Sequence, residues 1–426
     1  MRVAFSNLGC KLNQAELEDL ARRFAGAGHQ VVATVEQADL HVVNSCTVTV
    51  GAARNSRKTA RRGHRLNSSL RTVLTGCYVE SDRQQAAALA GVDLVVPNSE
   101  KDQLLDRVHT AFPELRPGQP MPAGDLPYLP LEFGNARALV KIEDGCDMQC
   151  AFCIIPSTRG QQRSRRPSEI IEEVSRLAQA GFPEIVLTGV QISSYRSTDA
   201  GRSGSTGLFE LTARLLDETP ARRLRLSSIA PWEFDPRLLD LFASGRLCRH
   251  FHLSLQSGCD ATLRRMRRPY STDQFSSLLR LIRERAPRAA MTTDVIVGFP
   301  GETEEEHRAS LAFVAGRSFA RIHAFPYSER PGTPAAAMPG KVAHAVVRER
   351  MHEMLEVARS SEADFTRLQV GETVPVLWES RVDGFWRGTS DNYLRVVLDS
   401  SADLERRLEA VELVRAEGTI LHGATI

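Results

Sequence analysis

The sequence predicts an α/β protein with three modules: an amino-terminal doubly wound α/β domain, a central partial (β/α)6 barrel and a carboxyl-terminal small antiparallel β-barrel. Two patterns in the sequence predict this fold class. Short apolar runs alternate with helical stretches in the first hundred residues and again from Ala138. The end of the chain then turns to short β-rich pieces separated by turns. A length of 426 residues also exceeds one ordinary core.

Composition excludes several other classes of protein. With 42% hydrophobic and 25% charged residues, the chain has the make-up of a folded globular protein. No apolar stretch approaches the ~18 residues of a membrane span, and the start MRVAFSNLGC has no signal-peptide core. We therefore expect a cytoplasmic protein without a membrane partner. Eight cysteines are too few for a disulfide scaffold in a chain this long, which favours metal binding or catalysis.

The first module is expected over residues 1–115. VAFSNL, DLHVVNS, TVLTG and DLVVP predict its strands, and residues 14–25 and 54–65 predict helices. The segment PELRPGQPMPAGDLPYLP is rich in proline and has no period, so we expect a linker at 116–131.

The second module is expected over 132–365 and the third over 366–426. Six strand candidates, separated by helical or mixed segments, predict the partial barrel: ALVKIE, EIVLTG, RLRLSSI, HFHLSLQ, TTDVIVGF and RIHAFPYS. A helical run near 342–365 ends this module. TVPVLWES, FWRGTS, NYLRVVLD and AVELVRAEGTIL then predict the strands of the small barrel.

A loop of the form Cys-x3-Cys-x2-Cys follows the first strand of the central module. Cys146, Cys150 and Cys153 therefore lie at the end of a barrel strand where active sites are built. Three thiolates suit a 4Fe–4S cluster and leave one iron open to an external molecule. A zinc site is the alternative, but its usual fourth ligand is missing nearby. A weaker alternative is that these cysteines are only buried thiols without a metal, because the segment GCDMQCAFC has no apolar face.

Three further cysteines each follow a predicted strand of the first module. Cys10 follows VAFSNLG, Cys46 follows DLHVVNS and Cys77 follows TVLTG. The carboxyl ends of parallel strands share one edge of a doubly wound sheet, so the three thiols are expected to converge and could bind a second cluster. Unrelated free thiols are the alternative. The remaining cysteines, Cys248 and Cys259, have no such context.

These motifs resemble a known enzyme family. EDGCDMQCAFCIIPSTRG resembles the cluster loop of radical S-adenosylmethionine (SAM) enzymes, and within them the methylthiotransferases. GCKLNQAE, NSCTVT and TGCY are similar to the three cysteine motifs of the methylthiotransferase amino-terminal domain. The resemblance covers essentially the whole chain. It implies SAM and two 4Fe–4S clusters as cofactors, with SAM bound at the Cys146/Cys150/Cys153 cluster and a transferable sulfur at the auxiliary cluster of Cys10, Cys46 and Cys77. A SAM-derived radical would remove hydrogen from an unreactive substrate carbon.

The same resemblance implies SAM contacts at other strand ends of the barrel. LTGVQISSY, HLSLQSGCD and DVIVGFPGETEEE would provide Gly189, Gln191, Ser254, Gln256 and Gly298. Polar residues that cap a buried strand are an equal explanation for Ser254 and Gln256. HAFPYSERPGTPA resembles the adenine-side loop of the family, or it is a rigid turn.

Basic residues cluster in two segments of the sequence, and both clusters predict RNA binding. The first is a stripe at helical spacing, with no acidic residue in 54–71: Arg54, Arg57, Lys58, Arg61, Arg62 and Arg65. The second lies just beyond the cysteine loop: Arg159, Arg163, Arg165 and Arg166. The carboxyl-terminal segment resembles a TRAM domain, an RNA-binding barrel. Its seven arginines against ten acidic residues argue against strong phosphate binding, although Trp386, Arg387 or Tyr393 could make local contacts or belong to its core.

GCKLN and NSCTVT are most similar to the MtaB-type branch of the family. That branch adds a methylthio group at C2 of N6-threonylcarbamoyladenosine at position 37 of tRNA, next to the anticodon. The resemblance therefore implies a tRNA anticodon stem-loop as substrate and a reduced flavodoxin or ferredoxin as electron donor. The alternatives are a methylthiotransferase acting on isopentenyladenosine in tRNA or on an aspartate of a ribosomal protein, and a non-enzymatic RNA-binding iron–sulfur sensor.

Overall fold

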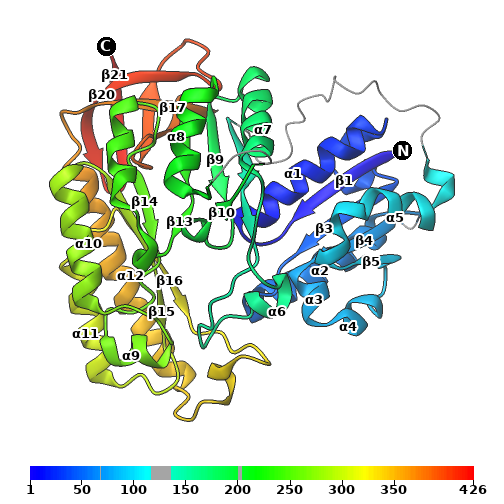
Figure 1. The fold of residues 1–426 in the computed structure, drawn as a ribbon, viewed down its shortest axis with the longest axis horizontal. Coiled ribbons are helices and arrows are strands. Elements are labelled where there is room, and N and C mark those ends of the chain that lie inside the picture. The colour runs from blue at the N-terminus through cyan, green and yellow to red at the C-terminus, as the bar shows by residue number, and fades with distance from the viewer. Residues whose placement is uncertain (68, 117–135, 200–203) are drawn as a thin grey trace.

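The fold comes from a computed structural model that describes residues 1–67, 69–116, 136–199 and 204–426. The amino-terminal domain (blue to cyan) lies beside the central domain (green to orange), and the carboxyl-terminal barrel (red) covers one end of the central strands (Figure 1). The predicted fold class is confirmed in all three parts. The predicted linker falls almost wholly outside the described residues.

The amino-terminal domain is built on a five-stranded parallel sheet in the order β2-β1-β3-β4-β5. Its strands are β1 (Arg2–Asn7), β2 (Gln30–Val32), β3 (Leu40–Ser45), β4 (Arg71–Gly76) and β5 (Leu94–Val96). Its helices are α1 (Lys11–Gly26), α2 (Val50–Leu66), α3 (Cys77–Ser81), α4 (Arg83–Ala87) and α5 (Leu104–Ala111).

Apolar side chains of both faces of this sheet are buried, which makes the domain doubly wound. On one face α1 and α5 pack against the sheet, and Val42 and Val73 belong to that core. On the other face α2, α3 and α4 pack over Val43 and Leu74. Successive strand residues point to opposite faces, so each of these strands contributes to both cores.

The central domain contains a curved parallel sheet in chain order. Its strands are β6 (Arg137–Lys141), β9 (Glu184–Thr188), β12 (Leu224–Leu226), β13 (Ser228–Ile229), β14 (His250–Leu253), β15 (Ala290–Val297) and β16 (Arg321–Pro326). Ser227 alone separates β12 from β13, where hydrogen bonding passes from one group of strands to the next. Within the described residues the edge strands β6 and β16 do not pair, so the barrel is partial.

Helices follow these strands and share one apolar core with them. The main ones are α7 (Pro167–Gln179), α8 (Leu208–Glu218), α10 (Thr272–Arg285), α11 (Glu304–Ala315) and α12 (His344–Arg367). The third unit has a 3-10 helix (Pro236–Ser244) in place of an α-helix. Short elements build the loops at the carboxyl ends of the strands: β7 (Glu143–Asp144), α6 (Ile155–Arg159), β8 (Arg163–Ser164), β10 (Arg196–Ser197), β11 (Thr206–Gly207) and α9 (Asp260–Arg265).

The carboxyl-terminal barrel is closed in the order β17-β18-β19-β21-β20. Its strands are β17 (Thr373–Val382), β18 (Phe385–Ser390), β19 (Arg395–Asp399), β20 (Leu408–Glu417) and β21 (Ile420–Thr425). Four pairings are antiparallel as predicted, whereas β19 and β21 run parallel. A closed ring of five strands cannot alternate direction at every step, so one parallel pair is required. No helix in the described ranges has the length and apolar character needed to cross a membrane.

Candidate functional site

The cysteine loop of the central domain is held at both of its ends. At Gly145 φ is +77°, and a Cβ there would lie 2.0 Å from the carbonyl oxygen of Gln161, so only glycine fits this turn. The amide of Cys146 donates to the carbonyl of Gly160 (3.0 Å), and that of Ala151 donates to Met266 (3.0 Å). The loop is therefore fixed against the end of α6 and against the segment that follows α9.

The three thiols of this loop face one another. Burial raises the pKa of Cys153 to about 12, and the nearby thiols of Cys150 and Cys146 add to this shift. Burial also raises the pKa of Cys146, with a further contribution from Cys150. All three cysteines are free thiols. Such a set needs a strong positive partner before its members become thiolates, and iron provides one.

A buried cation and an amide surround the loop on the side of the barrel. Nη1 of Arg268 donates to Sγ of Cys150 at 3.2 Å, and its guanidinium lies 4.5 Å from the ring centroid of Trp232. Arg268 also donates to the carbonyl of Ser254 (3.1 Å). The thiol of Cys146 lies 3.8 Å from Oε1 of Gln191. Both groups can orient the loop, and the Arg268 guanidinium can stabilise negative charge on the Cys150 sulfur.

The three cysteines of the amino-terminal domain also converge. Cys10 precedes α1, Cys46 directly follows β3 and Cys77 begins α3. At Gly9 φ is +130°, and a Cβ there would lie 3.1 Å from Sγ of Cys46. Burial raises the pKa of Cys46 to about 11, and the thiols of Cys77 and Cys10 raise it further. The structure thus brings the three predicted residues together at the carboxyl edge of the sheet.

Neither set of thiols is arranged for a single metal ion. Within the described residues, no three Cys, His, Asp or Glu side chains lie close enough together to coordinate one ion. A four-iron cluster has a different requirement, because each thiolate binds a different iron and the sulfur atoms lie farther apart. Three soft sulfur donors at each place suit iron–sulfur chemistry.

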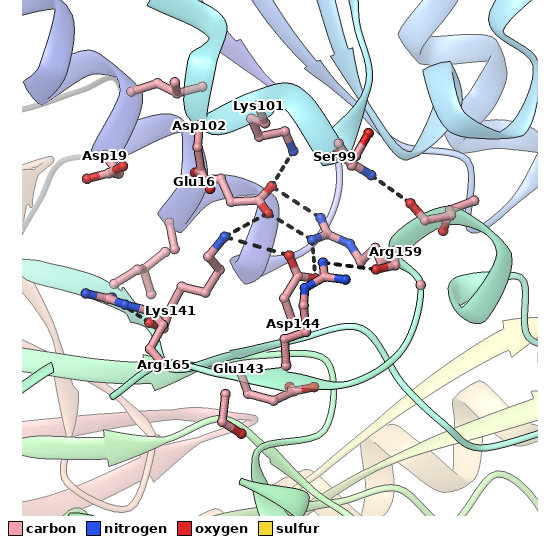
Figure 2. A pocket seen from close by; sticks show the side chains of 18 of the residues that line it. Glu16, Asp19, Ser99, Lys101, Asp102, Lys141, Glu143, Asp144, Arg159 and Arg165 are labelled. Carbon is pink, nitrogen blue, oxygen red and sulfur yellow. Dashed lines mark hydrogen bonds and ion pairs between the residues drawn. The ribbon is translucent and has the colours of Figure 1, made fainter. Parts of the chain in front are cut away.

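A buried ionic network joins the two cysteine sites across the domain boundary. Arg159, at the end of α6, pairs with Glu16 of α1 (2.9 Å) and with Asp144 of β7 (2.8 Å). It also donates to Oδ1 of Asn13 (2.7 Å), and Lys101 pairs with Glu16 at 2.6 Å. Figure 2 shows Lys101, Lys141 and Arg159 pointing toward the Glu16 carboxylate. Burial alone would raise the pKa of Glu16, but the surrounding cations lower it well below its usual range.

Two further contacts join the sites. The Asn98 side chain, in the 3-10 helix before α5, lies 3.9 Å from Sγ of Cys77 and donates to the carbonyl of Thr158 in α6 (2.9 Å). Arg330, in the segment after β16, donates to Oγ1 of Thr47, next to Cys46 (2.5 Å). Each contact ties a residue beside an auxiliary cysteine to the central domain.

A polar cavity of about 790 Å³ lies against the ionic network, between α1 and the central domain (Figure 2). Asp19 and Arg23 of α1 and Glu169 and Glu173 of α7 are among its lining residues. None of the six cysteines lines it. The cavity is therefore distinct from the two thiol sites.

The comparisons with known proteins agree with this division of the chain. Residues 2–97 match the uncharacterized protein family UPF0004, and residues 140–314 match the radical SAM superfamily. The threonylcarbamoyladenosine tRNA methylthiotransferase MtaB of Bacillus subtilis is 34% identical over 97% of this chain and 94% of its own. The chain belongs to the radical SAM methylthiotransferases. Membership implies SAM and a 4Fe–4S cluster.

Other relatives span the methylthiotransferase family. The ribosomal protein uS12 methylthiotransferase RimO of Roseiflexus castenholzii is 34% identical over 89% of this chain and 85% of its own. The structure of the radical SAM methyltransferase TsrM from Kitasatospora setae has a TM-score of 0.56 at 16% identity, covering 79% of this chain and 75% of that one. This structural likeness shows a shared fold.

The residues that the family resemblance implied as SAM contacts have different surroundings in the structure. Gln191 is next to Cys146, whereas Ser254 is joined to the cysteine loop only through Arg268, which donates to its carbonyl. A Cβ at Gly189 would lie 2.5 Å from the Glu143 carboxylate, and one at Gly298 would lie 2.6 Å from Val347, so packing explains both glycines. Gln256 has φ +69° and exchanges backbone hydrogen bonds with β15. Contact of these residues with SAM stays a prediction.

The two cationic patches differ in exposure. On α2 the small residues Ala53, Ala60 and Gly63 face the domain, whereas the cations project outward and the helix carries no acidic residue. The predicted RNA contact of Arg159 is wrong, because its guanidinium is buried in the ionic network. Arg163 is exposed, while Arg165 and Arg166 pair with glutamates.

Sequence reasoning missed several residues of this methylthiotransferase that touch the sites. Arg268 stands in the run RRMRRPY, where nothing in the pattern separates it from its neighbours. Glu16 lies within the helix predicted over 14–25, and Asn13 lies just before that predicted range but inside α1. The motif GCKLNQAE contained both, yet it gave no indication that they bind Arg159. In the barrel, Trp386 is core, with its indole NH donating to Ala402 (2.8 Å).

Proposed function

We propose that this methylthiotransferase adds a methylthio group to C2 of N6-threonylcarbamoyladenosine at position 37 of tRNA. The observation that carries the proposal is the pair of three-cysteine sites, one in each domain, joined by the buried Arg159 network. Similarity to MtaB of Bacillus subtilis over 97% of the chain supports the choice of substrate. The exposed cations of α2 support an RNA substrate.

Cys146, Cys150 and Cys153 would hold the 4Fe–4S cluster that binds SAM, and Cys10, Cys46 and Cys77 would hold a second 4Fe–4S cluster. When bound, these groups would supply the radical and sulfur-transfer chemistry that side-chain acids and bases cannot provide at an unreactive C–H bond. The protein must hold the two sites at a fixed separation. Arg159 and Asn98 do this from the central and the auxiliary side of the boundary.

The chain's own residues have three tasks in this proposal. Arg268 and Gln191 position the cysteine loop through contacts to Cys150 and Cys146. The buried network holds α1 against the end of α6 through the contacts of Arg159 with Glu16 and Asn13. The cationic face of α2 would bind phosphates of the anticodon stem-loop. A reduced flavodoxin or ferredoxin would supply electrons, and a tRNA substrate would place the enzyme in the cytoplasm.

Mass spectrometry of modified nucleosides tests the proposal directly. A strain that lacks the gene should lose 2-methylthio-N6-threonylcarbamoyladenosine and accumulate the unmethylthiolated nucleoside, and the wild-type gene should restore it. A Cys146→Ala gene should not restore it. If the nucleoside is unchanged while a ribosomal-protein aspartate loses its methylthio group, the tRNA assignment is wrong and the RimO-type activity is correct. If neither changes, a methylthiotransferase acting on isopentenyladenosine in tRNA and an RNA-binding sensor are the remaining candidates, and loss of the methylthio form of isopentenyladenosine identifies the first.

A further inference from the structure

All three domains meet at the side chain of Tyr393. This residue lies in the loop between β18 and β19, with φ +67°. Its ring centroid is 5.4 Å from Nζ of Lys11, 4.8 Å from the guanidinium of Arg225 and 4.7 Å from the ring of His250. Lys11 is the first residue of α1 and directly follows Cys10. A cation beside an auxiliary cysteine therefore points toward the inner face of the central sheet.

Lys11 forms no ion pair with any carboxylate of the described residues. Among the described residues, the lysines that form ion pairs are Lys101, Lys141 and Lys341. Arg225, on the same ring, is paired with the buried Glu184 (2.7 Å). Lys11 is half-buried, and its ammonium group lies over the Tyr393 ring instead of against a carboxylate.

The charge of Lys11 contributes to the pKa shifts of three neighbouring side chains. Lys11 is the largest cause of the lowered pKa of Tyr393. Burial lowers the pKa of His250 and of His323, and Lys11 contributes to both shifts. Two acids near this charge are already paired, Asp294 with His252 (3.2 Å) and Glu184 with Arg225 (2.7 Å). The surroundings thus favour an anionic ligand near Lys11.

The proposed substrate carries a fitting anion. The threonylcarbamoyl group ends in a free carboxylate and is attached to C6 of adenine through N6. C6 and the reacting carbon C2 flank the same ring nitrogen, so the carboxylate lies on the edge of the base that must face the auxiliary site. Cys10 would hold the cluster at that site, and Lys11 is its neighbour in the chain.

Resting on the proposed function, we infer that Lys11 binds the carboxylate of the threonylcarbamoyl group and selects this substrate. An adenosine with a neutral hydrocarbon group at N6 would leave the ammonium without a partner. A site that holds an unpaired charge discriminates strongly against ligands that cannot pair with it. The competing role for Lys11 is structural, through its contact with the Tyr393 ring alone.

Binding of three anticodon stem-loop RNAs to the anaerobic holoenzyme separates these roles. The RNAs carry N6-threonylcarbamoyladenosine, its methyl ester, or unmodified adenosine. We expect the wild-type enzyme to bind the acid roughly 10- to 100-fold more tightly than the ester, as one charge-assisted hydrogen bond allows. Lys11→Met should bind both equally, and Lys11→Arg should restore part of the preference. Lys341→Met removes an exposed charge and should behave as wild type.

Kinetics and iron content complete the test. Lys11→Met should raise KM for the acid RNA more than it lowers kcat, with the iron and sulfide content of the wild type. Equal binding of acid and ester by the wild-type enzyme overturns the inference whatever the variant does, and so does an unchanged preference in Lys11→Met. If the wild-type enzyme does not methylthiolate the acid RNA at all, the proposed function itself fails.

Discussion

At Arg159 a single guanidinium contacts both domains. It follows the cysteine loop by only six residues, yet its partners Asn13 and Glu16 lie in the helix that begins after Cys10. Because the side chain is only 1% exposed, water cannot replace these partners. A buried charge that loses its partner costs far more than an exposed one.

Replacing Arg159 by methionine should therefore destabilise the protein strongly. The variant removes the buried cation that Asp144 and Glu16 share and leaves both acids only the longer contacts of the part-exposed Lys141, besides Lys101 at Glu16. We expect a loss of about 3–5 kcal/mol in unfolding free energy. Arg166→Met is the matched control, because Arg166 is exposed and pairs with Glu169 at the surface; its effect should stay below about 1 kcal/mol. Urea unfolding followed by circular dichroism measures both. Equal destabilisation by the two variants would contradict the role given to Arg159.

At the scale of elements, the buried acid Glu18 of α1 makes the stability of the fold depend on pH. Burial raises the pKa of Glu18 from 4.5 to about 7, although Gln14 donates to it and Arg22 is near. The folded state then holds a proton that the unfolded state has released between pH 4.5 and 7. Stability contributed at Glu18 therefore falls as pH rises through this window and levels off above it.

Glu18→Gln should remove this pH dependence. We expect the variant to gain about 3 kcal/mol over the wild type at pH 8 and little at pH 5. Asp19→Asn, which changes the exposed neighbour that pairs with Arg23, should keep the wild-type pH profile. Chemical unfolding at the two pH values provides the comparison. A Glu18→Gln profile parallel to that of the wild type would show that the acid is ionised in the folded protein.

The helix α2 should contribute to RNA affinity through charge alone. Its cations are displayed on a face opposite to its small buried residues. Arg54→Gln combined with Arg61→Gln should weaken tRNA binding and reduce the slope of log affinity against log salt by about one for each phosphate that the helix no longer neutralises. Arg280→Gln with Arg348→Gln makes the same charge change on exposed positions of α10 and α12. The same slope in both double variants would exclude α2 from the interface.

At the scale of the whole molecule, buried charges attach the acidic carboxyl-terminal barrel. Glu184, fully buried at the start of β9, pairs with Arg137, Arg223 and Arg225. Arg225 also donates to the carbonyls of Ser390 and Asp391 in the barrel. The barrel therefore rests on the amino ends of the central strands, at the opposite end from the cysteine loop. This arrangement brings Tyr393 within reach of Lys11.

Local patterns in the sequence predicted the helices and strands well. They predicted the contacts between residues far apart in the sequence less well. The cysteines after β1, β3 and β4 could be expected to converge because parallel strands share an edge. Burial of Arg159 could not be expected, since a run of arginines looks the same whether its members face water or Glu16. The parallel pairing of β19 with β21 depends on closure of the whole five-stranded ring. It cannot be predicted from the sequence of any single strand. Lys11 likewise has its setting only because three domains meet.

The most direct measurement is the iron and sulfide content of the reconstituted enzyme and two triple variants. One variant replaces Cys146, Cys150 and Cys153 by alanine, and the other replaces Cys10, Cys46 and Cys77. Because each domain provides its own three thiols, each folded variant should retain half of the wild-type iron and sulfide and form no methylthiolated RNA. A folded variant that keeps all of its iron, or loses all of it, would contradict two separate clusters.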